Sequence, residues 1–228
     1  MMGIQWEYIF DPELAWETLP FLLAGVPKTL FIAIISTVIG MILGMVLTLM
    51  RMSSIWVVGW LARVYVSFMR GTPALVFLFL IYFGLPFINV QFDAMTAAII
   101  GFSLNSAAYI SEILRSSISS VDYGQWEAAK ALGLNKIVTM RAIILPQAIR
   151  IAVPPLGNVL LDVIKGTSLA AMITVNELFQ NARIVGGREY DYMTMYIMVA
   201  LIYWAVCSIF GYMQSYLEIV SSKYVEQH

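Results

Sequence analysis

An acid and a base lie close together inside a mostly apolar stretch of this sequence, between about residues 150 and 173. Asp162 and Lys165 are three residues apart and Asn158 precedes Asp162 by four, so on a helix all three share one face. Asp162 can accept hydrogen bonds from an ammonium group, and Lys165, Asn158 or Thr167 can donate to a carboxylate. Because charge within an apolar span usually faces a cavity or a partner, these residues are candidate contacts for a polar solute. The alternative is that Asp162 and Lys165 only neutralise each other.

Three further charged residues are weaker candidates. Arg70 could contact the same solute, or it could serve only to orient the chain in a membrane. Glu112 and Arg115 are three residues apart, which is the spacing of neighbours on a helix surface. We interpret this second pair as a structural ion pair.

The elements that position these residues are predicted from a membrane-like composition. Of the 228 residues, 61% are hydrophobic and 12% are charged, and the mean hydropathy is +0.83. Soluble domains are about half apolar and a quarter charged, and a spanning helix needs about 20 mostly apolar residues. The sequence therefore predicts an all-α, polytopic membrane protein with one transmembrane domain over residues 1–228. About five helices are expected near residues 22–50, 57–84, 93–117, 150–173 and 192–220.

The distribution of bases predicts how these helices are oriented in the lipid bilayer. Residues 86–93, between the second and third helices, contain no Lys or Arg. The bases near the ends of the first and third helices are Arg51, Arg63, Arg70, Arg115, Lys130, Lys136, Arg141 and Arg150. Because cytoplasmic loops are enriched in Lys and Arg, we expect the N-terminus outside and the C-terminus in the cytoplasm.

The longest connection, at about residues 119–150, has a specific pattern. Gln125 to Leu132 is rich in helix formers, and Gly133 followed by Asn135 is a helix stop. A second helical stretch is expected to begin near Lys136 and to be interrupted at Pro146, which has no amide hydrogen. The segment therefore predicts a short helix at the cytoplasmic ends of the spans, suited to docking a partner.

The spacing of residues in this segment resembles the EAA loop of ABC importer permeases. The matched positions are Glu127, Ala128, Ala129, Gly133, Ile143, Leu145 and Pro146. In that family the loop forms a coupling helix that inserts into a cleft of a separate ATPase subunit. The resemblance implies that Glu127, Ala128, Ala129 and Gly133 provide this coupling contact here.

Other segments narrow the resemblance to the polar amino acid uptake permeases, which are type I importer subunits. These segments are Arg70–Pro73, Ala107–Tyr109, Gly124–Gln125, Pro154–Asn158 and Thr167–Leu169. The resemblance implies a bacterial cytoplasmic membrane, a homodimer or a heterodimer with a similar permease, and an extracytoplasmic substrate-binding protein. It also implies transport of a polar amino acid, or of an amino-acid-like solute such as cystine. Val159 and Gly166 depart from the residues common in that family, which leaves the solute open.

The sequence contains little that could perform catalysis. The phosphate-binding pattern G-x-x-x-x-G-K-[ST] does not occur, so we expect ATP and Mg²⁺ to be bound by a partner chain. The single histidine, His228, and the single cysteine, Cys207, cannot supply a catalytic triad or a thiolate metal site. We predict no catalytic residue, no metal ligand and no cofactor in this chain, and no nucleic-acid partner. The alternative function is a secondary transporter or channel, which ATP dependence of uptake would distinguish.

Overall fold

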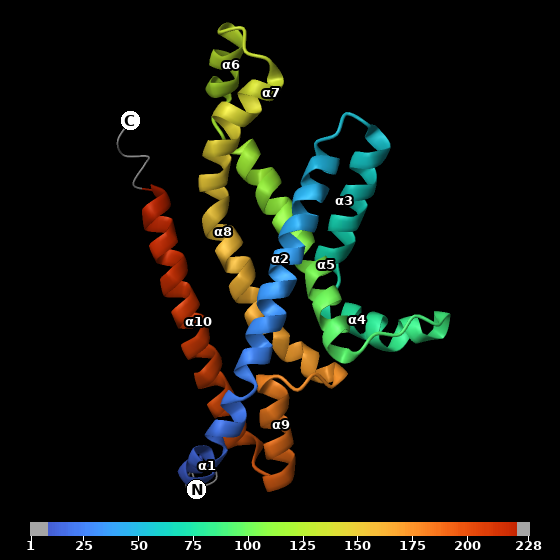
Figure 1. Cartoon of the computed structure of the whole chain (residues 1–228), viewed down its shortest axis with the longest axis vertical. Helices are drawn as coiled ribbons and strands as arrows, with labels where there is room; N and C mark the ends of the chain where they lie inside the picture. The colour runs from blue at the N-terminus through green and yellow to red at the C-terminus, as the bar shows by residue number, and fades with distance from the viewer. Residues whose placement is uncertain (1–8, 223–228) are drawn as a thin grey trace, which may run out of the picture. The chain divides into compact units, whose positions relative to one another are not determined.

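The chain is helical throughout the part that the computed structural model describes, residues 9–222, with no strand among them (Figure 1). The first half contains α1 (Pro12–Leu23), α2 (Val26–Arg51), α3 (Trp56–Gly71), α4 (Ala74–Phe79), the π-helical turn η2 (Leu80–Gly84), the 3-10 turn η3 (Leu85–Ile88) and α5 (Ala94–Ser119). The second half contains α6 (Tyr123–Ala131), α7 (Lys136–Thr139), the π-helical turn η4 (Met140–Ile144), α8 (Leu145–Gly166), the 3-10 turn η5 (Thr167–Ile173), α9 (Leu178–Glu189) and α10 (Tyr192–Ser222).

Four helical stretches are long and apolar enough to cross a membrane, and a helix pair bent by 104° makes a fifth candidate when its two parts are counted as one span. The four are Val26–Arg51, Ala94–Ser119, Lys136–Ile173 and Tyr192–Tyr216, and the pair is Trp56–Gly71 with Ala74–Ile88. The break follows Gly71 and coincides with Thr72 and Pro73, because a proline disfavours helical geometry in the residue before it. The predicted all-α, polytopic class is confirmed, with helix ends shifted by several residues.

The predicted interruption at Pro146 is wrong. The helical stretch from Lys136 continues through this proline to Ile173. Pro146 is the second residue of α8, and Leu145 separates it from the π-helical turn η4. A proline in the first turn of a helix removes an amide hydrogen that needs no partner within that helix, and the change from π- to α-type bonding makes room for its ring.

The described residues form two compact units, each built from three separate stretches of chain. One unit contains residues 9–36, 74–102 and 161–210, and the other contains residues 37–73, 103–160 and 211–222. The longest helices therefore contribute residues to both units. The single transmembrane domain expected over residues 1–228 stays a prediction.

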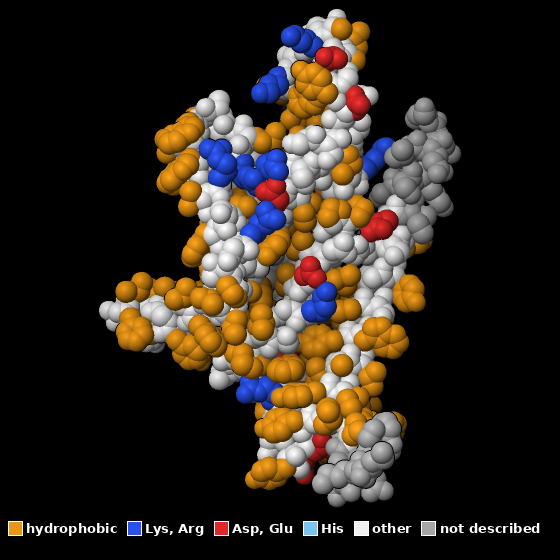
Figure 2. All heavy atoms as spheres, turned by 180° about the vertical axis from the view of Figure 1, so that it is seen from behind, with side chains coloured by type: hydrophobic (Ala, Val, Ile, Leu, Met, Phe, Trp, Pro, Cys, Tyr) orange, Lys and Arg blue, Asp and Glu red, His pale blue; other side chains and the backbone are white. Residues whose placement is uncertain are grey.

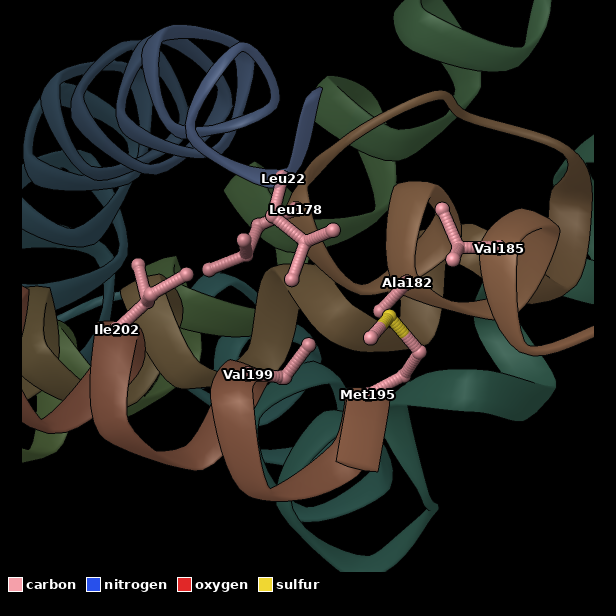
Figure 3. Close-up of a cluster of buried hydrophobic side chains, with 7 residues drawn as sticks. All are labelled: Leu22, Leu178, Ala182, Val185, Met195, Val199 and Ile202. Atoms are coloured by element: carbon pink, nitrogen blue, oxygen red, sulfur yellow. The ribbon is translucent and has the colours of Figure 1, made fainter. Parts of the chain in front are cut away.

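The first unit has a hydrophobic core where α1, α9 and α10 meet (Figure 3). Its residues on α9 and on α10 both follow the spacing i, i+4, i+7, which places them on one face of each helix. The seven residues are Leu22, Leu178, Ala182, Val185, Met195, Val199 and Ile202, all at most 9% exposed. With 12 residues each, α1 and α9 are too short to span a membrane. The core packs both helices against the N-terminal part of α10.

The second unit has a smaller core beneath α6. Val121, Ile144 and Ala148 are buried there, and the half-buried Trp126 packs against them. These contacts join the segment before α6 to η4 and α8. Elsewhere the long helices expose many large apolar side chains, and Figure 2 shows hydrophobic groups spread widely over one face of the molecule. Such exposed apolar surface is typical of helices that face lipid or a partner chain.

Candidate coupling helix and polar clusters

The short helix α6 carries the predicted coupling residues. It begins after Asp122, whose Oδ1 accepts a hydrogen bond of 2.6 Å from the Gly124 amide, as expected of an N-cap. Ala129 is 1% exposed and faces the chain, whereas Glu127 and Ala128 are exposed. The buried alanine therefore packs α6 against the rest of this unit, and Glu127 is left on the exposed face of the helix.

The end of α6 is a Schellman motif. The Gly133 amide donates to the Lys130 carbonyl and the Leu134 amide donates to the Ala129 carbonyl, each over 3.0 Å. Gly133 has a φ of 72°, in the left-handed region that favours glycine. Asn135 then caps α7, because its Oδ1 accepts a hydrogen bond of 2.9 Å from the Val138 amide. The predicted helix stop is confirmed at the residues that predicted it.

A hollow of about 480 Å³ lies between α6 and α7. Aromatic and aliphatic side chains line it together with one acid and two bases, a mixture found in protein docking surfaces. Its lining residues are Tyr123, Trp126, Glu127, Lys130, Leu134, Lys136 and Thr139. Glu127 thus belongs both to the exposed face of α6 and to the rim of this hollow.

The structure brings together the acid and base of the predicted solute site. Lys165 Nζ lies 2.8 Å from Asp162 Oδ1, and the two side chains are 58% and 73% exposed. Asn158 is also exposed on α8, and its Oδ1 accepts a hydrogen bond of 3.2 Å from Gln214 Nε2 on α10. The same amide group of Gln214 donates to the Pro154 carbonyl over 3.1 Å. All three predicted polar side chains on α8 are exposed, and each contacts another side chain.

The other two predicted solute contacts are engaged elsewhere. Thr167 is fully buried, donates a hydrogen bond of 2.7 Å to the Ile164 carbonyl, and lies 3.4 Å from the Tyr203 hydroxyl. The Arg70 guanidinium faces Glu112, with Nη1 3.6 Å from Oε2, and lies 5.6 Å from the centre of the Tyr109 ring. None of these contacts brings Thr167 or Arg70 to Asp162 or Lys165.

Glu112 and Arg115 form the ion pair predicted from their spacing. Sequence reasoning missed that Arg51 also contacts this carboxylate, with Nη1 2.8 Å from Oε2. Arg51 is the last residue of α2 and is 61 residues from Glu112 in the chain, so spacing within one helix could not reveal the contact. The cluster joins α2, α3 and α5 within one unit.

A buried carboxylate was also missed. Glu177 is fully buried just before α9, and its Oε1 accepts a hydrogen bond of 2.8 Å from the Gln180 amide. Its Oε2 accepts bonds from the Tyr203 hydroxyl at 2.9 Å and from Thr29 Oγ1 at 3.3 Å. Burial raises the pKa of the Glu177 carboxyl, although these hydrogen bonds act in the opposite direction. The sequence signal was weak, because an acid beside a helix start is usually an exposed cap.

No group of three His, Cys, Asp or Glu side chains that could hold a metal ion occurs within residues 9–222.

Residues 36–219 match the family model described as "Binding-protein-dependent transport system inner membrane component". The chain is 60% identical over 223 residues to the "Probable amino-acid ABC transporter permease protein YckA" of Bacillus subtilis, covering 98% of this chain and 99% of that protein. It is 44% identical to the "L-cystine transport system permease protein TcyB" of the same organism, covering 90% and 88%. The fold is similar to that in the crystal structure of an amino acid ABC transporter with histidines, with a TM-score of 0.88 at 36% identity, covering 91% of this chain and 97% of that one.

Proposed function

This chain belongs to the family of binding-protein-dependent transport system inner membrane components, and on that basis we propose that it forms the membrane path of an ATP-driven importer for a polar amino acid or an amino-acid-like solute such as cystine. The resemblance to ABC importer permeases is thereby confirmed, and the chain is a non-catalytic transmembrane subunit. The observation that carries the proposal is α6, which presents the exposed Glu127 and Ala128 and is followed by the left-handed Gly133.

The relatives support an amino acid as the transported solute. The permease from Bacillus subtilis that is 60% identical is described as a probable amino-acid permease, and the one that is 44% identical as an L-cystine permease. An amino acid carries an ammonium and a carboxylate, and the adjacent acid and base on α8 complement those two groups.

Asp162, Lys165 and Asn158 form the proposed solute site. The Asp162 carboxylate would accept hydrogen bonds from the solute ammonium, and Lys165 and the Asn158 amide would donate to its carboxylate. A bound zwitterion would replace the 2.8 Å contact between acid and base, so neither charge is left unpaired in the membrane. We propose no solute contact for Thr167, which is buried, or for Arg70, which Glu112 engages.

The partners follow from the same assignment. Two ATPase subunits would bind ATP and Mg²⁺ and receive α6 of each permease copy. A second copy of this chain, or a similar permease, would complete the path, and an extracytoplasmic binding protein would deliver the solute. With α6 on the cytoplasmic side of the bacterial inner membrane, the N-terminus lies outside the cell membrane and the C-terminus lies in the cytoplasm. The distribution of bases supports this orientation.

Transport would proceed by alternating access. Closure of the ATPase pair on bound ATP would move α6, and α5 and α8 would transmit this movement because α6 lies between them in the chain. The small core of Val121, Ile144 and Ala148, against which Trp126 packs, couples α6 mechanically to η4 and α8.

Purification from the native membrane in mild detergent tests this function. We expect an ATPase subunit to co-purify and ATP hydrolysis to rise when the binding protein and its amino acid are added. Glu127→Ala should weaken the association, whereas Glu13→Ala, which removes an exposed acid from α1, should not. An intact complex that transports without any ATPase would replace this proposal with a secondary transporter.

A further inference from the structure

A chain of polar groups runs from the buried carboxylate of Glu177 to the end of α8, within one unit of the structure. Tyr203 Oη lies 2.9 Å from Glu177 Oε2, and the fully buried Thr167 Oγ1 lies 3.4 Å from Tyr203 Oη. Thr167 Oγ1 also lies 2.7 Å from the Ile164 carbonyl oxygen. Because α8 ends at Gly166, this carbonyl belongs to the last turn of the helix.

The number of available hydrogens leaves a gap in this chain while Glu177 is ionised. A hydroxyl group has a single hydrogen to donate. The Tyr203 hydrogen is directed to Glu177 Oε2, and the Thr167 hydrogen is directed to the Ile164 carbonyl. No hydrogen remains for the contact between Tyr203 and Thr167, which at 3.4 Å exceeds the usual separation of about 2.7 Å between hydrogen-bonded oxygens. Two oxygen atoms therefore face each other without a hydrogen between them.

A proton on Glu177 would close this gap. Its Oε1 accepts a hydrogen bond of 2.8 Å from the Gln180 amide, which can only donate, so the proton belongs on Oε2. The protonated carboxyl would donate to Tyr203, and Tyr203 would then donate to Thr167. The bond from Thr167 to the Ile164 carbonyl would be unchanged. One proton thus produces a continuous series of hydrogen bonds from the carboxyl to the end of α8.

The groups that face Glu177 allow this proton. They are the Thr29 hydroxyl on α2, the Gln180 amide on α9 and the Tyr203 hydroxyl on α10. Thr29 can donate to Oε2 in either form, because a protonated carboxyl keeps part of its capacity to accept. Burial raises the pKa of the Glu177 carboxyl, so the protonated form persists to a higher pH than in an exposed acid.

The charged residues of the elements around Glu177 are directed elsewhere. Residues 167–173 and 192–210 contain no charged side chain. Among the described residues of α2, α8 and α9 that belong to this unit, no charged side chain forms an ion pair with Glu177. These side chains are Lys28 on α2, Asp162 and Lys165 on α8, and Arg183, Arg188 and Glu189 on α9.

We propose that Glu177, Tyr203 and Thr167 form a proton-dependent link that positions the solute site on α8, an inference that rests on the proposed function. Asp162 and Lys165 precede Thr167 by five and two residues, so the link fixes the last turns of the helix that carries them. Tyr203 and Thr167 are therefore positioning residues, which need not touch the solute. Ionisation of Glu177 would loosen the end of α8 and place the acid and base less well.

Hydrogen–deuterium exchange of residues 161–168 in the detergent-purified complex tests the link, with variants compared at the same pH. Glu177→Gln carries an amide that can donate to Tyr203 at every pH. At pH values well above 4.5 we expect this variant to exchange about fivefold more slowly than the unmodified protein, the effect of one added hydrogen bond. Tyr203→Phe breaks the link and should exchange fast at every pH.

Variants at Thr167 test the other end of the link. Thr167→Val removes the hydroxyl and should behave as Tyr203→Phe does, whereas Thr167→Ser keeps the hydroxyl and should restore protection. Tyr196→Phe is the control on α10, because the Tyr196 ring is 40% exposed and stacks on Phe179 through its face. It should exchange as the unmodified protein does.

Uptake of L-cystine by reconstituted vesicles connects the link to the solute site. Above the raised pKa of Glu177 we expect the apparent KM to be lower in Glu177→Gln than in the unmodified protein, and kcat to change little. A parallel loss of protection in Glu177→Gln and Tyr203→Phe would overturn the proposal in favour of a purely structural network. A KM that is the same in both variants would overturn the positioning role. Exchange is measured without solute, so its outcome is independent of whether the chain transports an amino acid.

Discussion

Tyr203 on α10 donates a hydrogen bond of 2.9 Å to the buried carboxylate of Glu177, immediately before α9. The same oxygen accepts from Thr29 on α2, and the other oxygen caps the first turn of α9 through the Gln180 amide. One side chain therefore ties α2, α9 and α10 together. A buried carboxylate with several donors is stable, but removal of one donor leaves it partly unsatisfied.

Tyr203→Phe should destabilise the first unit. The substitution keeps the ring but removes the donor to Glu177, which should cost about 1–3 kcal/mol. Thermal unfolding of the purified protein in detergent measures the effect. Tyr216→Phe on the same helix is the control, because Tyr216 is exposed and its loss of a hydroxyl should leave the unfolding temperature unchanged. Equal behaviour of the two variants would remove this hydrogen bond from the stabilising contacts.

Glu177 should make stability depend on pH. Burial raises its pKa in the folded state above the ordinary value of 4.5, so the folded chain holds this proton more tightly than the unfolded chain. Between the two pKa values the folded state binds more protons, and the stability contribution therefore decreases as pH rises through this window. Unfolding temperatures measured from below pH 4.5 upward should show this decrease. Glu177→Gln cannot ionise and should flatten the profile, and an unchanged profile in that variant would contradict the assignment.

Gly25 should tolerate no side chain. A Cβ at this position would lie 2.6 Å from the Leu178 backbone nitrogen and 2.8 Å from the Glu177 carbonyl carbon. Because these are backbone atoms of the segment that holds Glu177, Gly25→Ala must push α9 away, at a cost on the order of 1–3 kcal/mol. Gly211→Ala on α10 is the matched control, since no atom lies within 4 Å of its added Cβ. Limited proteolysis and thermal unfolding should separate the two variants.

The sequence predicted those features that depend on residues close together in the chain. Apolar length located the spans, and the Gly133 and Asn135 pair located the end of α6, because both signals act within one helix or one turn. The role of Glu177 was missed because its partner Thr29 is 148 residues away. The interruption at Pro146 was mispredicted because composition does not reveal a π-helical turn such as η4.

Gly133→Ala should impair the coupling of ATP hydrolysis to uptake, and its effect should arise only from the backbone conformation at this position. Its φ of 72° is unfavourable for residues with a Cβ, by about 1–2 kcal/mol, and no atom lies within 4 Å of an added Cβ. The strain should loosen the Schellman motif and lower the uptake achieved per ATP hydrolysed in reconstituted vesicles. Gly133→Asn should retain more coupling than Gly133→Ala, because asparagine adopts left-handed geometry more readily. If the alanine variant couples as well as the unmodified protein, the geometry at the end of α6 is not required.

Asp162 and Lys165 provide the test of the solute site. Asp162→Asn removes the acceptor charge for a solute ammonium, and we expect amino acid uptake to fall at least about tenfold, the loss of one charged hydrogen-bonded contact. Assembly with the ATPase should persist because the Asp162 side chain is 73% exposed. The double variant Asp162→Lys with Lys165→Asp keeps an ion pair at the same spacing but exchanges the positions of its charges. If the pair only neutralises itself, the double variant should transport normally. If it binds the solute, the exchange should leave uptake impaired while the purified complex remains intact, because the ammonium and carboxylate of the solute would each meet a group of their own charge.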